Sequence, residues 1–120
     1  MSTTKPLTIC PLPTPETLEA IRDRTSDNDH DGARVLALQE LVRLFDAHMR
    51  TVCGPGAAVP NPFRPLLAAA SELAAEHERA GFVSDPLLVV RAGLWRVAGT
   101  VAEHCGPALA PAWQKLNACL

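Results

Sequence analysis

Residues 33–55, ARVLALQELVRLFDAHMRTVCGP, carry the clearest structural signal in the chain. Their apolar residues recur at spacings of three and four, which is the pattern of a helix with one buried face. Gly54 suits the position just after a helix end, and Pro55 cannot continue a helix. The stretch therefore predicts a helix over residues 33–53. Its expected buried face consists of Val35, Leu38, Leu41, Val42, Phe45, Met49 and Val52.

Prolines mark where the other helices begin and end. A proline fits the first turn of a helix but not its interior, because its ring fixes φ and its nitrogen carries no hydrogen. Thr14 before Pro15, and Asn61 before Pro62, are therefore expected to cap helices. The 11 prolines divide the chain into predicted helices over residues 15–25, 33–53, 62–80, 86–105 and 110–119. The fourth of these is apolar around most of its circumference, so we expect it at the centre of the fold.

Residues 1–13 contain three prolines and are expected to form an extended arm. Residues 14–120 have the length of a single domain. Helices joined by short connections favour antiparallel packing. The predicted fold is therefore all-α: a compact antiparallel bundle of four to five helices with an extended, proline-rich N-terminal arm.

The charge balance excludes several classes of protein. Charged residues make up 20% of the chain and the net charge is −2, which fits neither a disordered polyelectrolyte nor a strongly basic nucleic-acid binder. No run of about 18 apolar residues is present, and the N-terminus lacks the apolar core of a secretory signal. We therefore expect a cytoplasmic protein with no nucleic-acid partner and no membrane partner. Arginine far outnumbers lysine, a composition typical of GC-rich bacterial or phage genomes.

The turn before residue 33 resembles the opening half of a calcium-binding loop. Asp27, Asp29, Asp31 and Gly32 follow the D-x-D-x-D-G order of an EF-hand. The last ligand position of that loop is Leu38, where a bidentate glutamate is required. We therefore interpret the turn as an acidic helix start in which Asp31 caps the helix.

Cysteines and histidines form a second candidate group. In an antiparallel bundle the start of the first helix and the ends of the second and fourth share one end of the molecule. Five residues would gather there: Cys10, Cys53, Cys105, His48 and His104. Such a set could bind zinc or form a disulfide. The simpler interpretation is free buried thiols and histidines that contact the carbonyl groups of helix ends, so we expect no metal and no cofactor.

No catalytic motif is present in the sequence. It contains no GxSxG, no HExxH and no glycine-rich phosphate loop. We therefore expect the protein not to be an enzyme. One alternative is an active site without a motif, assembled from scattered residues such as His77, Arg91 and Glu103.

Arg91 is unusual because it falls within the apolar face of the predicted fourth helix. An arginine there must pair with a carboxylate, extend to the edge of the face, or contact another molecule. Arginine and tryptophan are the residue types most enriched at binding hot spots. If this face is an interface, Arg91 and Trp95 are the expected anchors.

These observations favour a non-enzymatic protein that acts by binding a protein partner or by self-association, for example as a homodimer. A regulator, an accessory subunit and an inhibitor encoded by a mobile element all fit. The first alternative is a metal- or redox-responsive protein, and the second is the enzyme just described. The apolar residues of the arm add to the candidate interface, which consists of Leu7, Ile9, Leu12, Arg91 and Trp95.

Overall fold

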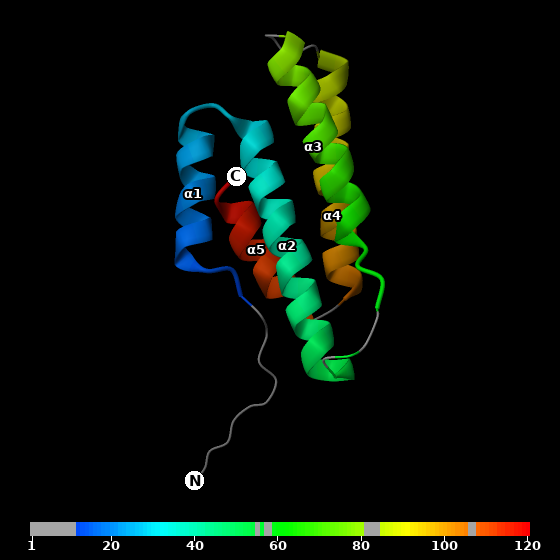
Figure 1. The fold of residues 1–120 in the computed structure, drawn as a ribbon. Coiled ribbons are helices and arrows are strands. Elements are labelled where there is room, and N and C mark those ends of the chain that lie inside the picture. Colours follow the sequence, from blue (N-terminus) through cyan, green and yellow to red (C-terminus); the bar gives the residue numbers. More distant parts are fainter. Residues whose placement is uncertain (1–11, 55, 57–58, 81–84, 106–107) are drawn as a thin grey trace.

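Five α-helices make up most of the computed structural model of the chain (Figure 1). It describes residues 12–54, 56, 59–80, 85–105 and 108–120, without the side chains of residues 77, 78, 80 and 85–92. No strand occurs in these ranges, so the predicted all-α class is confirmed. The helices are α1 (Pro15–Ser26), α2 (His30–Cys53), α3 (Phe63–Ala80), α4 (Asp85–His104) and α5 (Ala110–Ala118).

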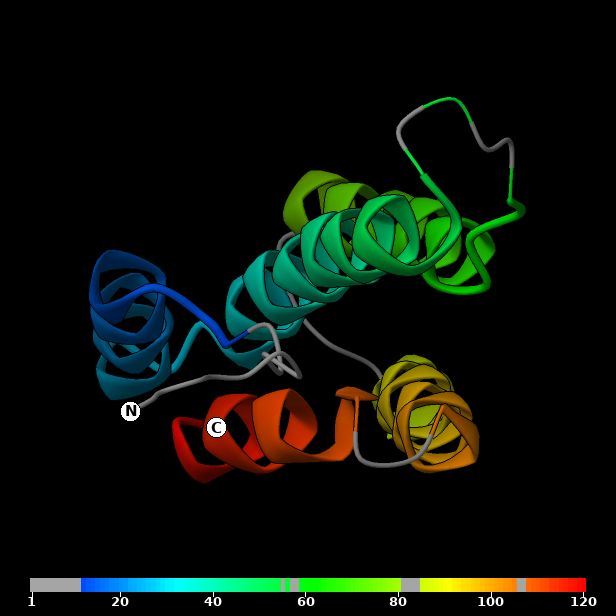
Figure 2. The same ribbon diagram turned by 90° about the horizontal axis from the view of Figure 1, so that it is seen from below.

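The helices run alternately up and down along the molecule, as the colours of Figure 1 show. In the view from below, α2 and α3 lie above α5 and α4, and α1 closes the side next to α2 and α5 (Figure 2). The upper parts of α3 and α4 extend beyond the connection between α1 and α2 (Figure 1). α3 and α4 thus form a hairpin whose upper end projects from the bundle (Figure 1).

Two of the predicted helix caps are confirmed. The Thr14 hydroxyl accepts a hydrogen bond from the Thr17 N–H at 3.2 Å, and Pro15 begins α1. Asn61 Oδ1 accepts from the Phe63 N–H at 2.9 Å. The Asn61 amide also donates to the Val42 carbonyl at 2.9 Å, so the buried cap fixes the start of α3 against α2.

The predicted start of the second helix is wrong by one turn. The helix begins at His30, and its cap is Asp29, whose Oδ1 accepts from the Gly32 N–H at 3.0 Å. Asn28 takes the left-handed conformation, with φ at 63°, and reverses the chain in fewer residues than expected. A Cβ at Gly32 would collide with the Asp29 carboxylate, so this glycine makes room for the cap.

The prediction that the 86–105 helix lies at the centre is also wrong. The central helix is α2, which packs against each of the other four helices. Its buried residues cover more than one stripe, whereas Val97 on α4 is exposed. The buried apolar residues of α2 are Ala33, Ala37, Leu38, Leu41, Val42, Leu44 and Phe45.

The predicted buried face of α2 does not continue to its end. Val52 is 63% exposed, and Met49 is half-buried. The last turn of α2 runs past the neighbouring helices at the lower end of the molecule (Figure 1). Among the described residues, no helix has the length and apolar content needed to cross a bilayer.

Candidate interaction surface

The arm residues of the predicted interface fall mostly outside the described ranges. Leu7 and Ile9 lie outside them, and so does the side chain of Arg91. Leu12 is described and is 46% exposed, next to Pro13, which is buried. The exposed side chain of Leu12 therefore lies directly beside a residue that packs into the bundle.

Trp95 lies inside the bundle and not on its surface. Its ring stacks on Trp113 of α5, with ring centroids 4.2 Å apart and planes at 28°. Its Nε1–H donates to Asn117 Oδ1 at 2.9 Å. Only 8% of Trp95 is exposed, so a partner cannot use this ring while α4 and α5 are packed.

Gly99 permits the close approach of α4 and α5. A Cβ at this position would lie 2.6 Å from Cζ2 of Trp113, so any larger residue would displace the indole ring. We call Trp95, Gly99, Trp113 and Asn117 the tryptophan lock. The sequence contains two signals of this contact. Each of the two helices has one aromatic residue, and a glycine follows Trp95 by one turn. The pattern of α4 alone does not predict the contact, because its other half lies on α5.

One member of the predicted Cys/His group, Cys10, lies outside the described residues. Cys53 and His104 are exposed, whereas His48 and Cys105 are half-buried. No three His, Cys, Asp or Glu residues within the described ranges are close enough to hold a metal ion. Burial raises the pKa of the Cys105 thiol, which keeps it protonated at neutral pH.

The acidic turn before α2 uses its carboxylates for local contacts. Asp29 caps α2 and also accepts from Arg24 Nη1 at 2.9 Å. Asp31 is buried, with its Oδ1 3.7 Å from Nη1 of Arg34. These carboxylates therefore make local contacts at the start of α2, but the capping residue is Asp29 and not the predicted Asp31.

Most of the alternative active site lies outside the described residues. The side chains of His77 and Arg91 lie outside the description, and Glu103 is exposed on α4.

Glu40 anchors the point where the arm leaves the bundle. Its Oε2 accepts from the Thr14 backbone N–H at 3.1 Å and from Arg43 Nη2 at 2.9 Å, and its Oε1 accepts from Arg43 Nε at 2.7 Å. Burial by itself would raise the pKa of Glu40. The hydrogen bonds from Arg43 and Thr14, and the positive charge of Arg43, outweigh that effect and hold the pKa below its ordinary value. The carboxylate thus stays charged and ties the start of α1 to α2.

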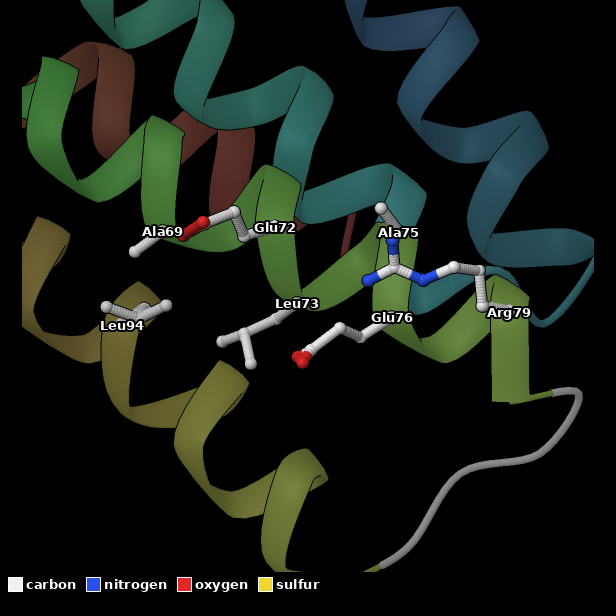
Figure 3. A pocket seen from close by; sticks show the side chains of 7 residues that line it. All are labelled: Ala69, Glu72, Leu73, Ala75, Glu76, Arg79 and Leu94. Carbon is white, nitrogen blue, oxygen red and sulfur yellow. The ribbon is translucent and has the colours of Figure 1, made fainter.

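An open groove of about 560 Å³ lies between α3 and α4 (Figure 3). Leu73 of α3 and Leu94 of α4 lie between the two helices, and the Glu76 carboxylate points to the same side of α3 (Figure 3). Both leucines are half-buried, so the floor of the groove is apolar and partly open to solvent. The residues that line this α3–α4 groove are Ala69, Glu72, Leu73, Ala75, Glu76, Arg79 and Leu94.

The rim of the groove carries two acidic side chains. Glu72 and Glu76 are both exposed and are four residues apart, so they lie on the same face of α3. Within the described ranges, neither carboxylate has a cationic partner within 4.0 Å, whereas four other acidic residues of the bundle do. Arg79 lies one turn further on, near the tip of the hairpin (Figure 3).

Comparison with protein-family models, with curated proteins and with solved structures finds no match to this chain. The groove is therefore interpreted from its own geometry and charge. Sequence reasoning missed it because no motif marks its lining, which mixes small, apolar and charged side chains. The exposed Glu72–Glu76 pair beside Leu73 is the one local signal that could have indicated it.

Proposed function

We propose that this chain is a non-enzymatic protein that acts by binding another protein, as a regulator, an accessory subunit or an inhibitor encoded by a mobile element. The observation that carries this proposal is the α3–α4 groove. It combines an apolar floor with a charged rim, and it is open to solvent. We also propose that the protein works in the cytoplasm.

The composition of the groove supports a protein ligand. Ala69 and Ala75 are small, so the backbone of a partner can approach α3 closely, and Leu73 and Leu94 offer apolar surface to it. Apolar grooves between helices commonly bind a segment of another protein through a few apolar side chains. A specific interface usually buries about 800 Å² on each partner, so the groove would form the centre of a larger contact.

The test compares two exposed alanines of the same helix. Ala75→Arg places a long charged side chain in the groove, whereas Ala68→Arg places the same side chain outside it. The tagged full chain and both variants are purified from the native host and analysed by light scattering and by mass spectrometry of copurified proteins. We expect self-association or a copurified protein that Ala75→Arg removes and Ala68→Arg retains.

A monomer without any copurified protein would contradict the proposal. So would an association that both variants retain, because binding would then not use the groove. Circular dichroism of the two variants checks that each keeps its helices.

A further inference from the structure

We propose that the α3–α4 groove binds the N-terminal arm of a second copy of this chain, so that the protein self-associates by exchanging arms. This inference rests on the proposed function and names the partner. Three features support it: the chemistry of the arm, the charge of the groove, and the position at which the arm leaves the bundle.

The arm has the composition of a ligand for an acidic apolar groove. Residues 1–13 contain no acidic residue, one lysine (Lys5), and apolar residues at Leu7 and Ile9. In an extended segment, residues two apart point to the same side, so Leu7 and Ile9 would face the groove together. The prolines restrict the free arm, which lowers the entropy lost when it binds.

The charge of the groove complements that of the arm. Glu72 and Glu76 are like charges at a spacing of four on one helix face, an arrangement that destabilises a helix unless a cation lies nearby. Lys5 of an incoming arm supplies such a cation. Arg79 near the hairpin tip repels Lys5, so the lysine is expected beside Glu72 and Glu76 with the arm's apolar residues over Leu73.

The position of the arm favours a second copy over the chain's own groove. The Thr14–Glu40 hydrogen bond fixes the exit of the arm at the lower end of α1 (Figure 1). α3 and α4 lie on the far side of α2 from that exit (Figure 1), and the groove lies between them. Lys5 to Ile9, the residues expected in the groove, lie only three to seven residues before Leu12, so they extend at most about 10–25 Å beyond it. Two chains that exchange arms around a two-fold axis form a closed dimer.

The decisive experiment is a charge exchange in the full-length chain, measured by size exclusion with light scattering. The unmodified protein is expected to be a dimer. Glu72→Lys with Glu76→Lys, or Lys5→Glu alone, should weaken dimerisation at least about tenfold, because each places like charges together. Combining Lys5→Glu with both groove substitutions should restore the dimer.

The matched control is Glu16→Lys with Glu19→Lys, which makes the same change of charge at two exposed positions of α1. This control should remain dimeric. Glu16 also lines a second groove, between α1 and α2, together with Leu36 and Arg43. The control therefore tests whether the arm binds in that groove. If the control dissociates the dimer and the groove variant does not, the arm binds elsewhere and the proposal is wrong.

A crosslink identifies the occupant directly. Ala75→Cys in a Cys53→Ser background is oxidised with diamide, and a disulfide between Cys10 of one chain and position 75 of another is expected on a non-reducing gel. Ala68→Cys in the same background should not form it. If the full-length chain is monomeric, the proposal of arm exchange is wrong. If another protein then copurifies and Ala75→Arg removes it, the proposed function still holds with a different partner.

Discussion

The two faces of α4 that the structure describes differ in how closely they are packed. Toward α5, the tryptophan lock brings two indole rings within 4.2 Å of each other, and Gly99 allows the approach. Toward α3, Leu94 lines an open groove together with Ala69, Leu73 and Glu76. The difference shows that aromatic side chains fix one face of α4, whereas the other face stays accessible beside Leu94.

The largest expected effect comes from removing the lock. Trp95→Ala deletes a buried ring, its stacking on Trp113 and its hydrogen bond to Asn117. We expect the free energy of unfolding, measured by urea denaturation, to fall by about 3–5 kcal/mol. Trp95→Phe keeps an aromatic ring and should lose less. A loss below about 1 kcal/mol for Trp95→Ala would show that the α4–α5 contact contributes little.

Two glycines on α4 should respond to alanine in opposite directions. At Gly99 the new Cβ meets the Trp113 ring, so we expect a loss of about 1–3 kcal/mol in the free energy of unfolding. At Gly93 a Cβ meets nothing within 4 Å, so the better helix former should stabilise by about 0.5–1 kcal/mol. Thermal and urea unfolding of the two variants measure both changes in the free energy of unfolding. Equal effects at the two sites would mean that Trp113 does not limit the approach of the helices.

Glu40 makes the junction of the arm sensitive to acid. Because its pKa is lower in the folded state than in the unfolded state, the unfolded chain binds the proton first as the pH falls. The stabilisation from this carboxylate is thus complete above its ordinary pKa of 4.5 and is lost as the pH falls through the lower folded value. Glu40→Gln should cost about 1–2 kcal/mol at pH 7 and should flatten the acid side of the stability profile. If the free energy of unfolding of the variant falls with acid as steeply as that of the unmodified chain, other carboxylates cause the acid sensitivity.

The smallest effect on stability is expected in the groove. Glu72→Lys with Glu76→Lys alters exposed side chains and should change the free energy of unfolding by no more than about 0.5 kcal/mol. The same variant is expected to weaken self-association, so urea denaturation of the monomer and light scattering should separate folding from binding. A large loss of stability would mean that these carboxylates support the bundle itself.

Local chemistry predicted the helices well. Thr14 and Asn61 act as caps because their side-chain oxygens lie next to unpaired N–H groups, which depends only on neighbouring residues. The start of α2 was misplaced because the left-handed Asn28 shortens the turn, and several acidic residues nearby could each have served as the cap. Helix ends thus follow from the sequence within about one turn.

The candidate site was much less predictable. Trp95 was expected on an interface because it is a large aromatic residue on an apolar face, yet Trp113, 18 positions away in the chain, covers it. The α3–α4 groove depends on the separation of two helices, which no local pattern encodes.

Helical class, helix order and most caps therefore follow from the sequence, because hydrogen bonding and backbone conformation act between residues close in the chain. The central place of α2, the tryptophan lock and the groove were decided only by tertiary packing. Several faces of the helices are apolar enough to be buried. The hydrophobic effect is non-directional, so it does not by itself select which of these faces pack together. Gly99 lets the Trp113 ring close one face of α4, whereas the groove stays open on the face toward α3.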